Sequence, residues 1–181
     1  MTRTIQALAA GLMLTALSIP AAQAASREQI DAEVREAIKE LYEHSSAAKE
    51  LAAKSAGMLV FPEVYKGGIG IGGEFGEGAL LVGGRTVAYY NTASASIGFQ
   101  LGAQKKSQVI LFMSGKELRK FRNSDGWKVG VDGSVALATL GAGGTIDTET
   151  AKKPIIGFIF SNKGLMYNLT FEGSKITEIE K

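Results

Sequence analysis

The sequence of 181 residues has no cysteine, one histidine and three prolines. Without cysteine, the chain has no disulfide framework, no thiol nucleophile and no thiolate metal site. A single histidine also leaves it without the multi-histidine sites that hold zinc or iron, so we expect neither a metal nor a cofactor. Apolar residues make up 45% and charged residues 21%, which is ordinary globular usage and argues against a disordered chain.

The chain also has little net charge, with a formal value of +2 at pH 7. A nucleic-acid-binding domain usually carries a large basic excess, because it must neutralise phosphates. We therefore expect no nucleic-acid partner.

Residues 1–24 have the pattern of a secretory signal peptide. Arg3 supplies the positive charge, Ile5–Ile19 is mostly apolar, and Ala22-Gln23-Ala24 has the small-x-small form of a cleavage site. An uncleaved anchor is the alternative, but this apolar run is shorter than the roughly 20 residues that a membrane span needs. We therefore expect an exported, periplasmic or secreted protein, whose residues 25–181 form one domain.

Residues 26–56 contain neither glycine nor proline and are predicted to be helical. Ser26 followed by Gln29 is a capping-box start, and Ser45-Ser46 precedes a second short helix at about Ala47–Ala56. Apolar residues recur along the first helix at helical spacing. They are Ile30, Val34, Ala37, Ile38 and Leu41.

Residues 57–181 are predicted to be rich in strands, with one mid-chain helix from the cap Ser114 to Asn123. The candidate strands are Met58–Phe61, Ile69–Phe75, Ala79–Val82, Thr86–Tyr90, Ala95–Ala103, Gln108–Met113, Lys128–Leu140, Ile155–Phe160 and Leu165–Phe171. No long helix separates successive strands, as parallel βαβ units require. We predict an α+β fold with N-terminal amphipathic helices and a strongly curved, mainly antiparallel, glycine-rich sheet, open or barrel-like.

Glycine is the one residue in clear excess, with 23 in the chain. It is densest at residues 67–84, where Gly68, Gly70 and Gly72 alternate with isoleucines. A G-x-G-x-x-G match is present there, but no helix follows it, so a dinucleotide site is not expected. One face of a strand here would therefore carry no side chains. Such a face allows either a bend of the sheet with close backbone approach, which we favour, or contact with an apolar ligand.

Catalytic groups are harder to find. His44 lies near a helix end, and the nearest serine motif, Ser94-Ala-Ser96-Ile-Gly98, lacks the first glycine of a nucleophile elbow. Several carboxylates lie near glycines, where turn and surface roles are usual. They are Glu74, Glu77, Asp125, Asp132 and Asp147. No acid–base pair is distinguishable among them, and we expect no enzymatic activity.

Basic residues crowd one part of the chain. They are Lys105, Lys106, Lys116, Arg119, Lys120, Arg122 and Lys128. On the mid-chain helix, Lys116, Arg119 and Lys120 share the face opposite Leu118 and Phe121. Such a surface is either a solvated helix face or a contact for anionic lipid headgroups.

Four blocks of the sequence resemble the SYLF-domain family, which includes the fungal actin-patch "actin-binding" domain. They are Gly57–Arg85, Val87–Lys105, Phe121–Ala138 and Pro154–Thr177. The resemblance implies lipid binding, with phosphoinositides or actin as partners of some eukaryotic members, and it implies no catalytic residues. Because of its predicted signal peptide, the chain resembles an exported bacterial member of this family.

Three functional hypotheses follow. The first is a lipid-binding module of the bacterial cell envelope that contacts phospholipid or a membrane surface, with Lys105, Lys106, Lys116, Arg119 and Lys120 facing phosphate. In it, Gly68, Gly70 and Gly72 would admit an acyl chain. The second is a structural or interaction protein of the envelope with an unknown protein partner. The third, the least favoured, is a hydrolase that uses two carboxylates.

Overall fold

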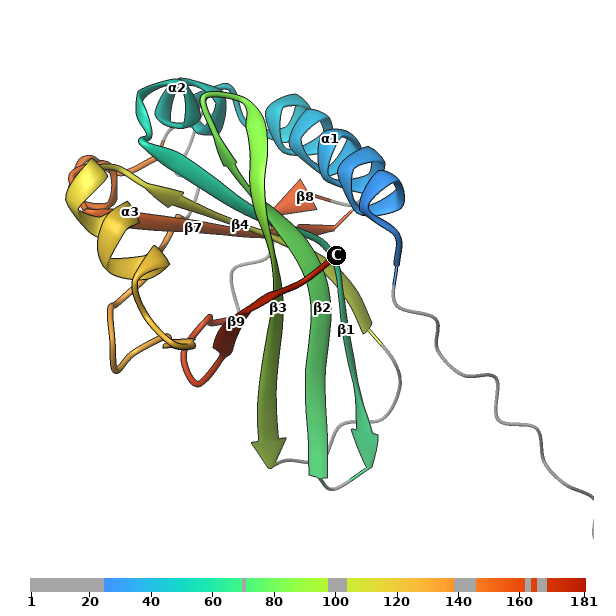
Figure 1. Cartoon of the computed structure of the whole chain (residues 1–181). Helices are drawn as coiled ribbons and strands as arrows, with labels where there is room; N and C mark the ends of the chain where they lie inside the picture. Colours follow the sequence, from blue (N-terminus) through green and yellow to red (C-terminus); the bar gives the residue numbers. More distant parts are fainter. Residues whose placement is uncertain (1–24, 70, 98–103, 139–145, 162–163, 166–168) are drawn as a thin grey trace, which may run out of the picture.

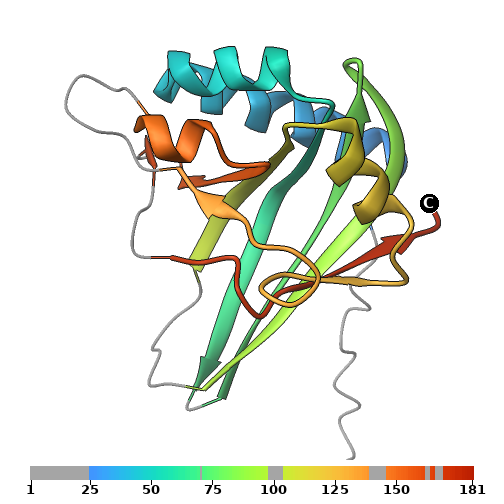
Figure 2. The ribbon, with the colours of Figure 1, turned by 90° about the vertical axis from the view of Figure 1, so that its left-hand side faces the viewer.

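The computed structural model describes residues 25–69, 71–97, 104–138, 146–161, 164–165 and 169–181. It shows a curled sheet with a helix pair on one side and a single helix on the other (Figures 1 and 2). The predicted signal peptide and part of the predicted strand Ala95–Ala103 lie outside the described residues. That 25–181 form one domain stays a prediction.

Two capped helices open the described chain, α1 (Arg27–His44) and α2 (Ser46–Lys54). The Oγ of Ser26 accepts a hydrogen bond from the Gln29 N–H at 3.2 Å, and that of Ser45 accepts from the Ala48 N–H at 3.0 Å. The predicted apolar stripe of α1 is buried at four positions, namely Ile30, Val34, Ala37 and Leu41. Both predicted helices are therefore confirmed. Within the described residues, no helix combines the length and apolarity that crossing a bilayer requires.

Nine strands form one sheet in the order β5-β9-β3-β2-β1-β4-β7-β6, with β8 paired to β7. The strands are β1 (Gly57–Ile69), β2 (Ile71–Val82), β3 (Arg85–Ile97), β4 (Gln104–Phe112), β5 (Trp127–Lys128), β6 (Ala136–Leu137), β7 (Ile155–Ser161), β8 (Gly164–Leu165) and β9 (Lys175–Ile179). Among the named pairs, only β6 with β7 is parallel. The sheet curls into a half-barrel, so the predicted α+β fold with a strongly curved, mainly antiparallel sheet is confirmed.

The central strands bury side chains on both faces. On the face that carries α1, Val60, Val109 and Phe158 pack with the apolar stripe of that helix. On the other face, Leu59 and Ile110 pack beneath α3 (Gly115–Arg122). We call these the α1 face and the α3 face. Their burial places the two hydrophobic cores on opposite sides of the same strands.

Aromatic rings hold α3 and the segment after it on the sheet. The ring centroid of Phe121 lies 4.8 Å from Phe112, 5.0 Å from Tyr90 and 5.6 Å from Trp127. All four side chains are buried. Because such ring pairs add to the gain from apolar burial, this cluster fixes where α3 sits.

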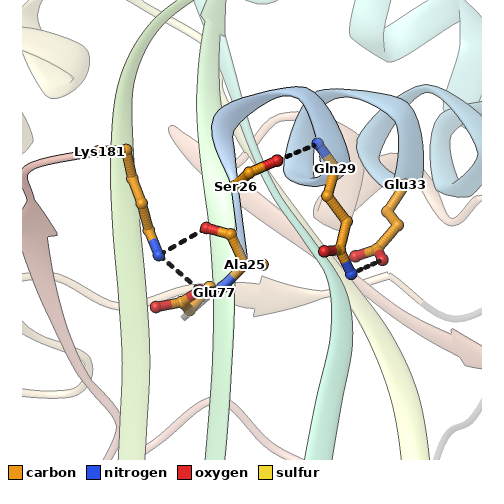
Figure 3. A network of polar contacts seen from close by, with 6 residues as sticks. All are labelled: Ala25, Ser26, Gln29, Glu33, Glu77 and Lys181. Atoms are coloured by element: carbon orange, nitrogen blue, oxygen red, sulfur yellow. Dashed lines mark hydrogen bonds and ion pairs between the residues drawn. The ribbon is translucent and has the colours of Figure 1, made fainter. Parts of the chain in front are cut away.

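The start of α1 and the last residue are joined to β2 through one carboxylate (Figure 3). The Lys181 ammonium donates to the carbonyl of Ala25 at 3.0 Å and to Glu77 at 2.8 Å. The backbone N–H of Ala25 also donates to Glu77, at 3.2 Å. Glu77 therefore has a structural role at this position.

Two glycines of β2 are required by the close approach of β1. The register between these strands shifts between Val60 and Glu63, which marks a bulge. A Cβ added at Gly78 would lie 2.0 Å from the carbonyl oxygen of Val60, and one at Gly76 would lie 2.5 Å from that of Glu63. Close backbone approach, the favoured interpretation of the strand glycines, therefore occurs at Gly76 and Gly78, whereas for Gly68, Gly70 and Gly72 it stays a prediction.

Several predicted strands are wrong. Ile69–Phe75 is not one strand, because Ile69 pairs with Ile71 and the chain reverses between β1 and β2. Lys128–Leu140 is also not continuous: β5 and β6 lie at its ends, and a turn at Val131 and Asp132 intervenes. Of Leu165–Phe171, only Leu165 lies in a described strand. Strand β9 and the short helix α4 (Thr148–Ala151) were not predicted.

Strands β1, β2 and β3 continue together past the rest of the sheet, toward the bottom of Figure 1. We call residues 65–69, 71–75 and 93–97 the tongue. Its first row pairs Tyr65, Phe75 and Ala93, and its last row pairs Ile69, Ile71 and Ile97. The described ladders from β1 to β4 and from β3 to β9 end at Lys66 and Ala93. Beyond these residues, the described part of the tongue is a three-stranded ribbon.

We expect Gly78→Ala to destabilise the fold, because the added methyl group must displace the backbone of β1. Overpacking of this kind costs about 1–3 kcal/mol. Gly67→Ala is the matched control on the paired strand, since nothing lies within 4 Å of its added Cβ. Urea unfolding of both variants measures the difference. Equal stability of the two variants would contradict the steric role of Gly78.

We expect stability to fall above about pH 10, where an unfolded tyrosine ionises. Burial, followed by the nearby Glu178 carboxylate, raises the pKa of Tyr90 in the folded chain. The Tyr90 hydroxyl donates to that carboxylate at 3.1 Å. Below this pH, Tyr90 is protonated in both the folded and the unfolded chain. Above it, only the unfolded chain loses this proton, which stabilises the unfolded state relative to the folded one. Tyr90→Phe should therefore lose less thermal stability between pH 9 and pH 11 than the parent chain, and an identical loss would refute this assignment.

Candidate functional site

Helix α3 carries the most exposed group of cations predicted from the sequence. Ser114 caps it as predicted, accepting from the Glu117 N–H at 3.3 Å, and Leu118 and Phe121 are buried beneath it. Because these two side chains point into the core, the opposite side of α3 faces solvent. The residues exposed there are Lys116, Arg119, Lys120 and Arg122.

Most of these α3 cations lack a neutralising partner. Lys120 donates to the backbone carbonyl of Asp132 at 2.5 Å, which holds its ammonium without neutralising it. Within the part of the chain that the structure describes, Lys116, Arg119 and Arg122 take part in no ion pair. Helix α3 therefore presents positive charge to solvent.

Lys105 and Lys106, adjacent in β4, point to opposite faces of the sheet. Lys105 is exposed on the α1 face and pairs with Glu63 at 2.6 Å. The Tyr65 hydroxyl donates to the same carboxylate. These two hydrogen bonds, that from Lys105 first, hold the pKa of Glu63 below its usual range. Lys105 is therefore already neutralised.

Lys106 is buried on the α3 face, with 3% of its side chain exposed. Its ammonium lies 2.7 Å from one oxygen of Glu74, whose other oxygen lies 3.4 Å from the Lys66 ammonium. Two ammonium groups thus share one carboxylate, which leaves a local surplus of one positive charge. Because buried charges are costly without partners, Glu74 is required for this arrangement.

The structure therefore divides the predicted lipid-binding residues. Lys105 and Lys106 lie at the start of β4, whereas α3 begins just after its end. A strand of nine residues spans about 30 Å. The predicted Gly68 and Gly72 pair with each other at the end of the tongue, beyond Lys66, and Gly70 lies outside the described residues. Only Lys116, Arg119 and Lys120 remain together as predicted.

A groove of about 390 Å³ separates α1 from the start of β4. Its lining includes Lys105 and four glutamates, namely Glu33, Glu36, Glu40 and Glu63. These carboxylates oppose entry of an anionic headgroup. Of the carboxylates considered for hydrolysis, Glu74 and Glu77 bind lysines, Asp132 accepts from the Lys128 N–H, and Asp147 caps α4. These four have structural partners.

Sequence reasoning missed Tyr65, Lys66 and Phe75. Tyr65 and Phe75 are directly paired and more than half exposed, at 53% and 52%. A usable signal is present, because residues 65–75 read almost the same in both directions about Gly70. Such symmetry is typical of a tight hairpin and predicts the observed pairing of Gly67 with Gly73 and of Gly68 with Gly72.

We expect Glu74→Gln to destabilise the fold strongly, because it leaves two ammonium groups without their carboxylate. Removal of one partner of a buried pair costs about 3–5 kcal/mol. Glu63→Gln, which breaks the exposed pair with Lys105, should cost less than about 1 kcal/mol. Urea unfolding at pH 7 compares the two variants. Similar losses would show that the cluster around Glu74 is no more important than a surface pair.

One comparison with known proteins is informative. Residues 93–181 match the family model described as "Ysc84: Las17-binding protein actin regulator". No curated protein matches the chain. The match begins within β3 and includes β4, α3 and everything after them. Members of this family are binding domains linked to lipids and to actin, and the family is not known for enzymatic activity. Residues 93–181 therefore belong to the Ysc84 (SYLF) family, which confirms for this region the resemblance found in the sequence.

Proposed function

We propose that this protein is a lipid-binding module of the bacterial cell envelope, which contacts anionic phospholipid and catalyses no reaction. The observation that carries the proposal is the surface of α3, where Lys116, Arg119 and Arg122 have no ion-pair partner among the described residues. The helix lies inside the matched region of a family linked to lipids. Unpaired cations on an otherwise near-neutral chain suit an anionic surface.

The electrostatic attraction expected between the α3 cations and an anionic membrane is large enough for selective binding. Each basic residue near a strongly anionic membrane contributes about 1 kcal/mol. Three such residues favour an anionic over a neutral membrane by about 3 kcal/mol, which corresponds to roughly a hundredfold difference in binding. Salt screens exposed charges over about 10 Å at 0.1 M, so binding should weaken as salt is raised.

The predicted signal peptide supports the proposed location. Cleavage after Ala24 would release residues 25–181 into the periplasm or the medium, where the anionic lipid of the envelope is the available surface. The protein would then be peripheral to a membrane.

The second candidate is an envelope protein that binds another protein. The family description names a Las17-binding regulator, which is a protein-binding activity. This alternative uses the same exposed surfaces but requires no lipid.

Sedimentation with vesicles tests the proposal. We expect the purified protein to sediment with vesicles of mixed neutral and anionic phospholipid at low salt, and far less with neutral vesicles or in 0.5 M salt. Equal recovery with neutral and anionic vesicles, or no binding to either, would refute it. The second candidate would then be favoured.

A charge-reversed variant tests the role of α3. Lys116→Glu with Arg119→Glu should lower binding to anionic vesicles at least tenfold. Lys49→Glu with Lys54→Glu is the matched control, because these exposed residues of α2 change the net charge by the same amount. Equal losses in both double variants would show that net charge, and not the α3 surface, governs binding.

A further inference from the structure

The tongue exposes apolar surface where the rest of the sheet is covered. Among the residues whose side-chain exposure the structure describes, the exposed large apolar side chains are Tyr65, Phe75, Val87 and Val131. Tyr65 and Phe75 are direct partners across β1 and β2. They form one aromatic patch on the α1 face, and contiguous exposed apolar surface commonly marks a contact site.

Beyond the row of Lys66 and Glu74, which follows the aromatic row, the end of the tongue carries no charge. The last three rows contain only glycine, alanine, serine and isoleucine, and the final row pairs Ile69, Ile71 and Ile97. These rows extend about 10 Å past the row of Lys66 and Glu74. An uncharged end of this length is suited to the region between water and hydrocarbon.

The charged residues nearest this end are Lys66 and Glu74, and Lys105 and Lys106 follow on the neighbouring strand β4. Lys66 lies in the row next to the aromatic pair, Lys105 pairs with Tyr65, and Lys106 pairs with Val64. Glu74 pairs with Lys66, and Glu63 and Glu77 pair two rows from Tyr65 and Phe75, on the side away from the end. Because Lys66 and Lys106 share Glu74, this level keeps a surplus of one positive charge. Moving from its end, the tongue therefore presents three uncharged rows, then the row of Lys66 and Glu74, then the aromatic row. Amphipathic aromatic rings and lysines are both favoured at a membrane–water interface.

We propose that the free end of the tongue is the element through which this protein enters a phospholipid surface. The inference rests on the proposed function and names its contact element. The uncharged end enters the headgroup layer, Lys66 lies at the outer boundary of that layer, where its ammonium can meet phosphate, and Tyr65 and Phe75 lie in the next row, on the α1 face.

The geometry limits how deeply the tongue enters. The isoleucine row lies about 13 Å beyond the aromatic row, whereas a headgroup layer is about 5–8 Å thick. The described ladders leave β1 without β4 beyond Lys66, and β3 without β9 beyond Ala93. Open sheet edges are unstable in hydrocarbon, so the contact is shallow.

A second copy of the chain is a poorer occupant of this surface. Two tongues packed against each other would bring together the surplus positive charge that Lys66 and Lys106 leave at Glu74, and like charges across an interface oppose association. An anionic lipid surface neutralises the same lysines instead.

Phe75→Glu tests the inference, because a carboxylate at this position would lie among anionic headgroups. We expect at least a tenfold loss of binding to anionic vesicles. Val87→Glu is the matched control, since Val87 is 45% exposed and lies near the opposite end of β3. Both changes are at exposed positions, and thermal melting checks that both variants fold.

The outcomes separate this inference from the proposed function. Failure of the parent protein to bind vesicles would refute the function itself. Normal binding by Phe75→Glu, with loss in the α3 variant, would overturn the tongue alone. A parent protein that is dimeric without lipid, and becomes monomeric on Phe75→Glu, would overturn the lipid contact in favour of a second copy.

A second readout uses the absence of cysteine, which allows single-site labelling. An environment-sensitive dye on the Ile71→Cys variant should brighten and shift to shorter wavelength when anionic vesicles are added. The same dye on Val87→Cys should not change. A change at Val87→Cys with none at Ile71→Cys would overturn the inference.

The contacts of Ala25 carry a separate inference about maturation. Its backbone nitrogen lies 3.2 Å from Glu77, which also binds Lys181. Cleavage after Ala24 would convert this amide into a protonated amine at the same position. We infer that processing forms a charge-assisted contact between the new N-terminus and Glu77, joining both chain ends to β2.

Acetylation of the new N-terminus removes this charge and tests the inference. Thermal melting should show that the acetylated chain beginning at Ala25 unfolds at a lower temperature than the free-amine form. In Glu77→Gln the two forms should melt together. An acetylation effect that persists in Glu77→Gln, or no effect in the parent, would overturn it.

Discussion

The structure depends on the burial of both faces of the central strands. Described residues of β4 from Lys106 to Phe112, and of β7 from Ile155 to Phe160, are buried on either side. Such strands cannot face water, so each face needs its own cover. Helices α1 and α2 cover one, and α3 with the Trp127 segment covers the other. The positions of all three helices follow from this requirement.

The candidate contact surfaces occur where this covering ends. Helix α3 must bury Leu118 and Phe121, and its short amphipathic sequence therefore turns its cations outward. Strands β1, β2 and β3 continue past the covered region as the tongue, where glycines replace large side chains and Tyr65 and Phe75 are exposed. The same packing that stabilises the centre thus leaves two distinct surfaces available, one basic and one largely apolar.

Local signals predicted the helices well, because capping serines and apolar spacing act within a few residues. The mainly antiparallel pairing of the strands was also predictable, because no long helix separates successive strands. Register was not: Lys105 and Lys106 are neighbours in sequence, but strand alternation and the β1 bulge place one in solvent and the other beside Glu74. The predicted strand Lys128–Leu140 failed because Gly130, Asp132 and Gly133 favour a turn over the strand preference of the valines between them. Strand β9 depends on a long-range pairing with β3 that no local pattern reveals.

A tongue that enters an anionic lipid surface must have its backbone shielded there. Hydrogen–deuterium exchange of the whole protein, with and without anionic vesicles, tests this contact most directly. We expect vesicles to slow backbone exchange in residues 65–75 and 93–97, with little change in α1 and α2. Unchanged exchange in the tongue of a vesicle-bound protein, or protection confined to α1 and α2, would contradict this contact.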